Sequence, residues 1–370
     1  MRQTIASVTI CAGMVLSASA AAQQPQTPPE PAPAPAAAPA AATPAAKAPL
    51  KPIGLYGIVD VFVTTGDYGN GTRTRVDSNG ARASRLGLRG GKEITDDLSV
   101  QYTYEMGLDL THARKADRHR VFNRQAWVSL VSEDYGMLRV GRQNTPQFIM
   151  LGKYDAMDAT TQSSGLLNLA PFVPRYSRLV SYFTPKIAGA VTLQAHYGMG
   201  ERLFNGNRTN SWHVAAEYEK GPVGLGVTHE HVKDLGTATV ETDYTLAGGS
   251  YDFGRFKVFG GYHHVTTSNA SREADTYSTS VLYRMTPVDT LSLGYSVLSD
   301  RLPANNDASQ VGLLYQRFLR PQTVVYAGVA HIDNRNAARF TLNGSAVAGT
   351  PLTEPGFNPQ ALQLGFRHAF

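Results

Sequence analysis

The sequence has a single cysteine, Cys11, which lies in an apolar run near the start of the chain. A lipid-attachment motif places a small residue directly before its cysteine, and Ile10 occupies that position here. We therefore exclude a lipid anchor at Cys11. Because we expect residues 1–22 to be removed as a leader, the mature chain would contain no cysteine, which excludes disulfide bonds and thiol chemistry.

Long apolar runs are also absent, since no stretch reaches the roughly 18 residues that a membrane-spanning helix needs. The formal net charge of +5 is a small excess for this length, so we expect no nucleic-acid partner. The sequence contains no Gly-x-Ser-x-Gly elbow, phosphate-binding loop or zinc signature. His229 and His231 share one strand face, but two ligands do not close a metal site. We expect neither enzymatic activity nor a cofactor.

Two segments at the start of the chain lack the composition of a folded domain. A basic residue, the apolar run Ile5–Leu16 and the small residues that follow are typical of a secretory signal peptide, which we place at residues 1–22. Residues 23–52 are mostly Ala, Pro and Gln and cannot bury a core, so we predict a flexible, extended tail. The folded domain is expected at residues 53–370.

Apolar and polar residues alternate along much of the remaining chain. Residues 98–109 are the clearest case, and residues 55–63, 191–197 and 291–297 follow the same pattern. A period of two predicts β-strands with one apolar and one polar face. In a soluble sandwich the apolar faces meet inside, whereas in an outer-membrane barrel they face lipid and the polar faces line water.

The lengths of the connections favour the barrel. Short turns and longer loops alternate, as in a bacterial barrel with short periplasmic turns and long outer loops. We expect turns near residues 93–96, 132–135, 185–189, 220–222, 252–254, 286–289 and 319–322, and loops at 65–80, 111–118, 145–174, 200–210, 233–240, 267–271, 300–307 and 333–358. These connections join sixteen strands, and a barrel of about that size leaves an aqueous channel. We predict an all-β, transmembrane, antiparallel β-barrel of 16 strands.

One connection, residues 145–174, is far longer than a structureless loop of a compact domain usually is. We call it the long loop, and we predict that it folds into the barrel and narrows the pore. At the other end of the chain, Leu362, Leu364 and Phe366 alternate toward a terminal Phe370. A terminal aromatic on an alternating last strand is the usual signal for barrel assembly, so we expect the barrel-assembly machinery to recognise Phe370.

In their order and spacing, several short motifs resemble the trimeric, sixteen-stranded general porins of Gram-negative bacteria, in their betaproteobacterial branch. The motifs are Leu55–Gly57 with Asp60, Ser84–Gly90, Phe122–Val128, Gly141–Gln143, Arg175–Pro185 with Gly189, and Gly365–Phe370. The resemblance covers roughly residues 53–370. The Ala/Pro-rich tail departs from the family, and so does the long loop, which has Thr160–Gly165 in place of the Pro-Glu-Phe-Gly motif of enterobacterial relatives.

The resemblance implies a pore constriction in which arginines on the barrel wall face acids on the long loop. Arg85 carries over from the second-strand motif, and its phase agrees because Leu86 and Leu88 take the lipid face. Arg175 carries over from the strand after the long loop, where alternation places Tyr176 toward lipid. For each arginine, the alternative is a structural ion pair on the wall or at a rim.

Two further arginines conflict with simple alternation. Arg142 carries over from the Gly-Arg-Gln motif, but its phase places it with Leu138 and Val140 on the outside. A bulge, or the end of the strand, would turn it inward. Arg124 shares an outer face with Ala126, so it could lie in a subunit interface instead of the pore.

The acids of the predicted constriction are Asp155 and Asp158, the only carboxylates between Gly141 and Arg175. The alternative for either is an exposed charge or a hydrogen bond that anchors the loop, and Lys153 would offset one of them. By phase, Asp60 and Glu105 also point into the lumen. At the predicted constriction, three or four arginines and one lysine face two to four acids, so we expect a weak preference for anions.

The sequence is thus interpreted as an outer-membrane porin, a water-filled channel for passive diffusion of small hydrophilic solutes and ions. The resemblance implies a homotrimer in the Gram-negative outer membrane, in contact with lipid and lipopolysaccharide. One alternative is a substrate-selective porin with a ladder of lumen aromatics, for which Tyr56, Phe62, Trp127 and Phe183 are the candidates. Another alternative is a non-conducting adhesin or structural barrel.

Overall fold

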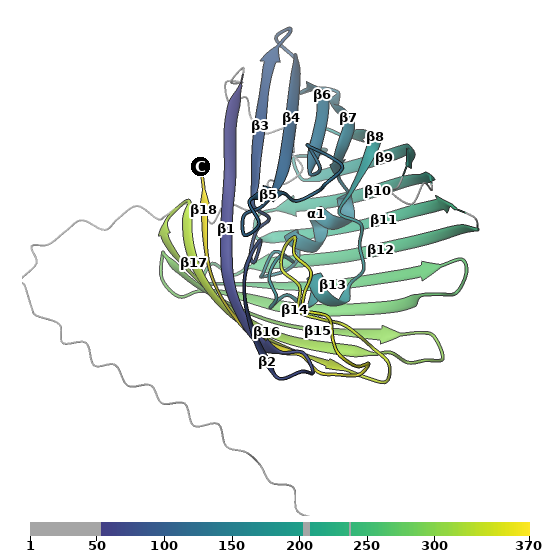
Figure 1. The fold of residues 1–370 in the computed structure, drawn as a ribbon. Coiled ribbons are helices and arrows are strands. Elements are labelled where there is room, and N and C mark those ends of the chain that lie inside the picture. The colour runs from purple at the N-terminus through teal and green to yellow at the C-terminus, as the bar shows by residue number, and fades with distance from the viewer. Residues whose placement is uncertain (1–52, 203–207, 237) are drawn as a thin grey trace, which may run out of the picture. The chain divides into compact units, whose positions relative to one another are not determined.

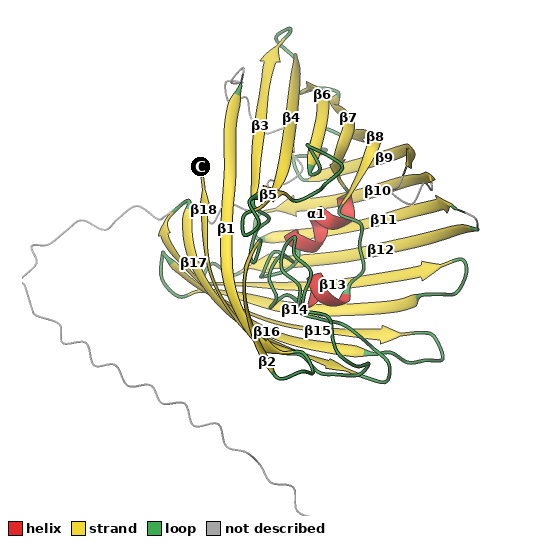
Figure 2. Ribbon diagram, viewed as in Figure 1, coloured by secondary structure: helices red, strands yellow, loops and turns green. Residues whose placement is uncertain are grey.

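The computed structural model describes residues 53–202, 208–236 and 238–370. The predicted leader (1–22) and tail (23–52) lie outside these residues. No helix in the described ranges is long and apolar enough to cross a membrane. Strands make up most of the described chain, and they curve around an interior that holds the two helices (Figures 1 and 2).

The bounds of the elements follow the order of the chain. The strands are β1 (Gly54–Asp67), β2 (Thr72–Ser78), β3 (Arg85–Glu93), β4 (Leu98–Asp109), β5 (Arg114–Lys115), β6 (Gln125–Ser132), β7 (Gly136–Asn144), β8 (Arg175–Phe183), β9 (Val191–Arg202), β10 (Arg208–Lys220), β11 (Val223–Leu235), β12 (Thr239–Asp252), β13 (Phe256–Thr267), β14 (Glu273–Arg284), β15 (Asp289–Asp300), β16 (Ala308–Arg320), β17 (Thr323–Asn334) and β18 (Gln360–Ala369). The helices are α1 (Pro146–Lys153) and α2 (Gly165–Leu169).

The sheet is antiparallel and closes on itself, because β1 pairs with β18 from Ile58↔Ala369 to Asp67↔Gln360. β2 and β3 pair with successive parts of β1 and therefore share one place in the wall. β5 pairs with the end of β4 in a separate small sheet. The wall thus has 16 strand positions, which confirms the predicted barrel.

The prediction of a long first loop at residues 65–80 is wrong. β1 continues to Asp67 and β2 begins at Thr72, so only a tight turn joins them. The turn is possible because Gly69 and Gly71 adopt φ values of +109° and +72°, which a side chain would disfavour. The chain leaves the wall later, between β2 and β3, in a segment that we call the inner bend (residues 79–84).

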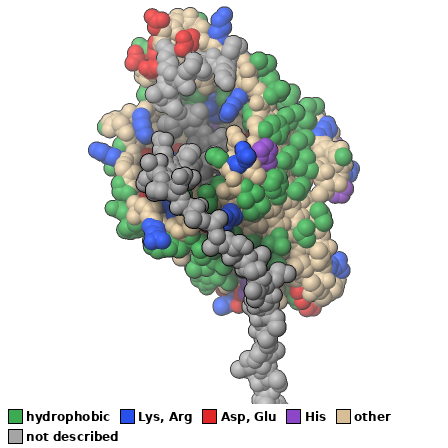
Figure 3. Space-filling model, turned by 90° about the vertical axis from the view of Figure 1, so that its left-hand side faces the viewer, with side chains coloured by type: hydrophobic (Ala, Val, Ile, Leu, Met, Phe, Trp, Pro, Cys, Tyr) green, Lys and Arg blue, Asp and Glu red, His purple; other side chains and the backbone are tan. Residues whose placement is uncertain are grey.

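The two faces of the wall differ as the alternation predicts. On β1, Leu55, Val61 and Val63 are exposed on the outside, with Leu55 at 72%. Phe62 and Thr64 are buried on the inside. Figure 3 shows hydrophobic side chains gathered on the outer wall of the face in view. This is the arrangement of a barrel whose outer face meets lipid.

The long loop leaves β7, returns at β8, and lies inside the barrel (Figure 2). Both helices begin with a capped turn, since Thr145 accepts the N–H of Phe148 and Ser164 accepts the N–H of Leu167. α1 contacts the wall at β10, β11 and β12, and α2 contacts it at β14, β15 and β16. The prediction that this loop folds into the barrel is confirmed.

Packing against glycines holds the loop close to the wall. Tyr154, which follows α1, is buried with Met150, Leu151 and Leu166. A Cβ at Gly226 or Gly248 would come within 2.8 Å or 2.5 Å of the Tyr154 ring. Glycine at these wall positions therefore makes room for the loop.

Candidate pore constriction

A buried carboxylate on the inner face of β4 organises the basic side of the site. Glu105 accepts hydrogen bonds from Arg124 Nε at 2.5 Å and from the Tyr56 hydroxyl at 2.9 Å. Arg85 Nε lies 3.6 Å from the same carboxylate. Arg124 precedes β6, which begins at Gln125, so strand alternation does not set its direction. The structure therefore places Arg124 beside lumen-phase Glu105.

Arg142 and Arg175 lie in the same basic cluster. The strand register shifts between Gly141 and Gln143, which is the bulge that would turn Arg142 from the outer phase. Arg142 Nε donates to the Asn123 carbonyl at 2.6 Å. The Arg175 guanidinium lies 5.1 Å from the Phe148 ring centre, within electrostatic range of Arg124, Arg142 and Glu105. The structure thus brings the four predicted arginines together.

The direction predicted for Tyr176 is wrong. Tyr176 does not face lipid but is buried with Leu179 and Val232, and its ring lies 5.4 Å from that of His213. Arg178 has a φ of +55°, and β8 slips against β7 at this point. Because of this irregularity, the alternation of inward and outward side chains along β8 is reversed beyond Arg178.

Asp158 is the long-loop carboxylate that faces a wall arginine. Its side chain is 45% exposed and forms an ion pair with Arg82 of the inner bend. Asp60 holds this bend, because its carboxylate accepts the backbone N–H groups of Gly80, Ala81 and Arg82. Tyr326 donates to the same carboxylate at 2.8 Å.

Asp155, by contrast, anchors the loop. Its side chain is buried and accepts hydrogen bonds from the Ser164 hydroxyl, the Ala159 N–H and the Ser280 hydroxyl of β14. Burial raises the pKa of the Asp155 carboxyl, although these hydrogen bonds lower it. Its surroundings match the loop-anchoring alternative.

The sequence predicts that Lys153 offsets one of the long-loop acids, but the structure places it elsewhere. Its ammonium group pairs with Glu217 and Glu219 of β10. Burial lowers the pKa of Lys153, but these two carboxylates raise the pKa by more than burial lowers it. The pKa of Lys153 therefore lies above its usual value. The lysine therefore ties α1 to the wall.

Sequence reasoning missed two arginines of the site. Arg82 follows the turn-forming residues Asn79 and Gly80, a signal that could have indicated an interruption of the second strand. Arg367 on β18 is within electrostatic range of Arg82, Asp60 and Asp158. Arg367 follows the exposed Phe366, so strand alternation places it on the inner face, and this alternation could have identified it.

The histidine pair considered as a metal site lies on the outer face of β11. His231 Nδ1 is 2.9 Å from Asp243 Oδ1, and His229 Nε2 is 3.4 Å from the same oxygen. Within the described residues, no group of three or more His, Cys, Asp or Glu side chains is arranged to hold a metal ion.

Comparisons with known proteins agree with this architecture. The family model described as "Gram-negative porin" matches residues 9–337. The chain is 27% identical over 345 residues to outer membrane porin protein 32 of Delftia acidovorans, which covers 86% of this chain and 94% of that protein. It is also 26% identical over 252 residues to an outer membrane porin of Bordetella pertussis. This match covers 58% of this chain and 64% of that protein.

Solved structures share the fold. An anion-selective porin from Comamonas acidovorans superposes with a TM-score of 0.74 at 24% identity, covering 86% of this chain and 99% of that one. The trimer form of OmpT from Vibrio cholerae superposes with a TM-score of 0.64 at 16% identity, with the same coverage.

Proposed function

The chain belongs to the Gram-negative porin family, and from this premise we propose that it forms a water-filled channel with a weak preference for anions. It is a multi-stranded barrel of the outer membrane. Small hydrophilic solutes and ions cross the channel by passive diffusion. Membership of this family favours a channel without catalytic activity.

The charge imbalance at the narrowing carries this proposal. The basic side holds Arg82, Arg85, Arg124, Arg142, Arg175 and Arg367. Opposite charge comes from Glu105, which lies among the arginines, from Asp158, and from Asp60, which holds the inner bend. Fixed positive charge along a narrow aqueous path raises the local concentration of anions. The shared fold of an anion-selective porin from Comamonas acidovorans supports the same preference.

A planar-bilayer recording across a KCl gradient tests the proposal. We expect stepwise channel currents and a reversal potential with the sign of anion preference. The preference should shrink as the salt concentration rises, because ions screen the fixed charges over about 10 Å at 0.1 M and about 3 Å at 1 M. A cation-signed reversal potential would refute the anion preference, and a protein that inserts without conducting would be a structural barrel.

We also propose partners for this channel. The trimer form of the Vibrio relative supports a homotrimer, and native mass measurement in mild detergent checks it. Lipid and lipopolysaccharide would cover the remaining outer wall, and the barrel-assembly machinery would recognise Phe370.

The leader at residues 1–22 and the tail at 23–52 stay predictions. The intact mass of the protein from outer membranes checks whether the leader is removed.

A further inference from the structure

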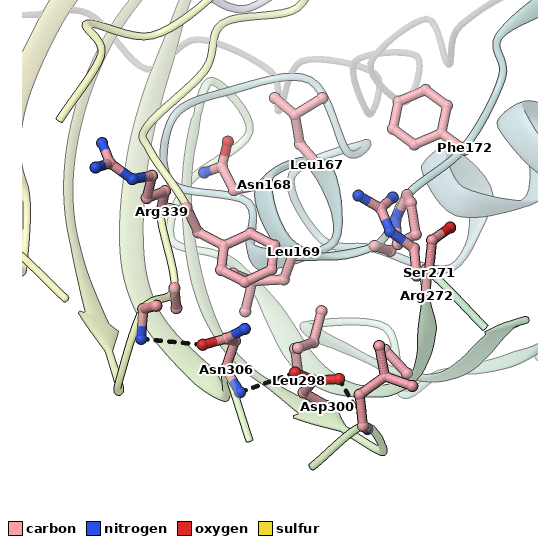
Figure 4. A pocket seen from close by; sticks show the side chains of 17 residues that line it. Leu167, Asn168, Leu169, Phe172, Ser271, Arg272, Leu298, Asp300, Asn306 and Arg339 are labelled. Carbon is pink, nitrogen blue, oxygen red and sulfur yellow. Dashed lines mark hydrogen bonds between the residues drawn. The ribbon is translucent and has the colours of Figure 1, made fainter. Parts of the chain in front are cut away.

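A cavity of about 530 Å³ lies beside the long loop, away from the arginine cluster around Glu105. One side is formed by α2 and the residues that follow it, up to Phe172. The other side is formed by the inner faces of β14 and β15 and by the connections after β13, β15 and β17 (Figure 4). This volume is within the range of about 300–1,000 Å³ that small-molecule sites occupy.

The cavity has an apolar floor. Leu169, Leu298 and Ala274 are buried there in one hydrophobic cluster, against which Phe340 packs. Ala338 is also buried and lines the cavity. Leu167 and Phe172 of the long loop complete the lining. A ligand with an apolar body would therefore remove apolar surface from water on several sides.

Two arginines lie above this floor, Arg272 before β14 and Arg339 after β17. Figure 4 shows them on opposite sides of Leu169. Both side chains are exposed, and neither forms an ion pair with any residue that the structure describes. Arg339 Nη1 has one long contact, 3.5 Å to the Leu352 carbonyl. Both guanidiniums are thus available to an anionic group.

Asp300 is the one carboxylate among the lining residues, and its role is local. Its oxygens accept the backbone N–H groups of Leu302 at 3.0 Å and Asn306 at 2.9 Å. These bonds shape the connection after β15. The lining therefore keeps a net positive charge, with two arginines against one engaged acid.

We propose that this cavity binds small organic anions that carry an apolar ring, of which aromatic monocarboxylates are the simplest class. The ring would lie on the apolar floor, and the carboxylate would take charge-assisted hydrogen bonds from Arg272 or Arg339. The inference rests on the proposed channel function, because the bound anion would reach the cavity through the aqueous interior. It makes the channel selective by chemistry as well as by charge.

Benzoate in planar-bilayer recordings is the test. Acetate carries the same charge without the ring, and benzyl alcohol carries the ring without the charge. We expect benzoate to reduce the wild-type current at concentrations at least about tenfold lower than those at which acetate or benzyl alcohol has the same effect. The effect should be weaker in 1 M KCl than in 0.1 M KCl, because salt screens the arginines.

Variants separate the two parts of the site. The double variant R272Q/R339Q should weaken the benzoate effect about tenfold, as expected for loss of a charge-assisted hydrogen bond. The control R255Q/R320Q removes the same charge from exposed arginines at the opposite rim and should leave the effect unchanged. L167S should weaken the benzoate effect but not the acetate effect.

The outcomes distinguish this inference from the proposed function. If the wild-type protein conducts but benzoate acts no better than acetate, or equally on R272Q/R339Q, the binding site is refuted and the channel stands. If the wild-type protein does not conduct, the proposed function fails. Calorimetric titration of benzoate into the detergent-solubilised protein then decides the site directly, with no heat of binding refuting it.

Discussion

At the scale of single residues, the two carboxylates of the long loop have opposite surroundings. Asp155 is buried and hydrogen-bonded within the loop and to Ser280, whereas Asp158 is half exposed beside Arg82. A fixed charge influences permeating ions most where water reaches it and the path is narrow. The two residues should therefore contribute differently to selectivity, although the sequence presents them as equivalent.

Replacing Asp158 with asparagine should move the reversal potential in a KCl gradient further toward anion preference, because it removes the negative charge beside Arg82. Asp155→Asn is the matched control. Its amide oxygen can still accept from Ala159 and Ser164, and its amide nitrogen can donate to the Ser280 hydroxyl, so the loop keeps its anchor. Recordings of both variants under one gradient measure the effect. No shift in Asp158→Asn would contradict a role for Asp158 at the narrowing, and equal shifts in the two variants would contradict the difference between the two acids.

At the scale of elements, the start of α1 is fixed by a buried polar contact. The backbone N–H of Gln147 donates to Glu230 Oε1 on β11 at 2.8 Å, and the Gln147 side chain contacts His263. Glu230 and His213 are fully buried, 3.3 Å apart. A carboxylate at the first turn of a helix also interacts favourably with the helix dipole. β11 therefore holds the long loop at its first helix.

Glu230→Ala should loosen the long loop without unfolding the barrel. It leaves the Gln147 N–H without its acceptor, at a cost of about 1–3 kcal/mol for loop docking. We expect greater open-channel current noise and faster hydrogen exchange in residues 145–174, with little change in the melting temperature of the barrel. His229→Ala, on the outer face of the same strand, is the control. Exchange and noise at wild-type levels in Glu230→Ala would show that this contact does not hold the loop.

At the scale of the whole barrel, closure depends on the pairing of the first and last strands. Beyond β18, Phe370 and Gly57 exchange two backbone hydrogen bonds, at 2.9 Å and 3.0 Å. A Cβ at Gly57 would come within 2.3 Å of the Phe370 ring, so the ring occupies the space left by the glycine. The terminal aromatic therefore contributes to the seam as well as to the predicted recognition by the assembly machinery.

Deleting Phe370 should reduce the amount of folded, heat-modifiable protein in outer membranes, because it removes both hydrogen bonds and the ring at the seam. Phe253→Ala, at an exposed turn residue, should leave that amount unchanged. The folded fraction is measured from the shift in gel mobility on heating. A wild-type folded fraction after the deletion would mean that closure and assembly do not need Phe370.

Local sequence patterns were sufficient for the strand number, the barrel, and the inward phase of Asp60, Glu105 and Arg85. Alternation and connection length are properties of adjacent residues, so they do not depend on distant contacts. The same rule misplaced Tyr176, because a single residue with a positive φ, Arg178, reversed the phase of its strand.

Only the tertiary structure decided which charges meet. Asp158 faces Arg82 from a segment 76 positions away, and Asp155 is anchored by Ser280, 125 positions away. Such pairings depend on how the long loop packs against the wall and on the inner bend held by Asp60. They arise from three-dimensional packing between segments that no local periodicity relates, which is why the roles of the two loop acids could not be separated before the fold was known.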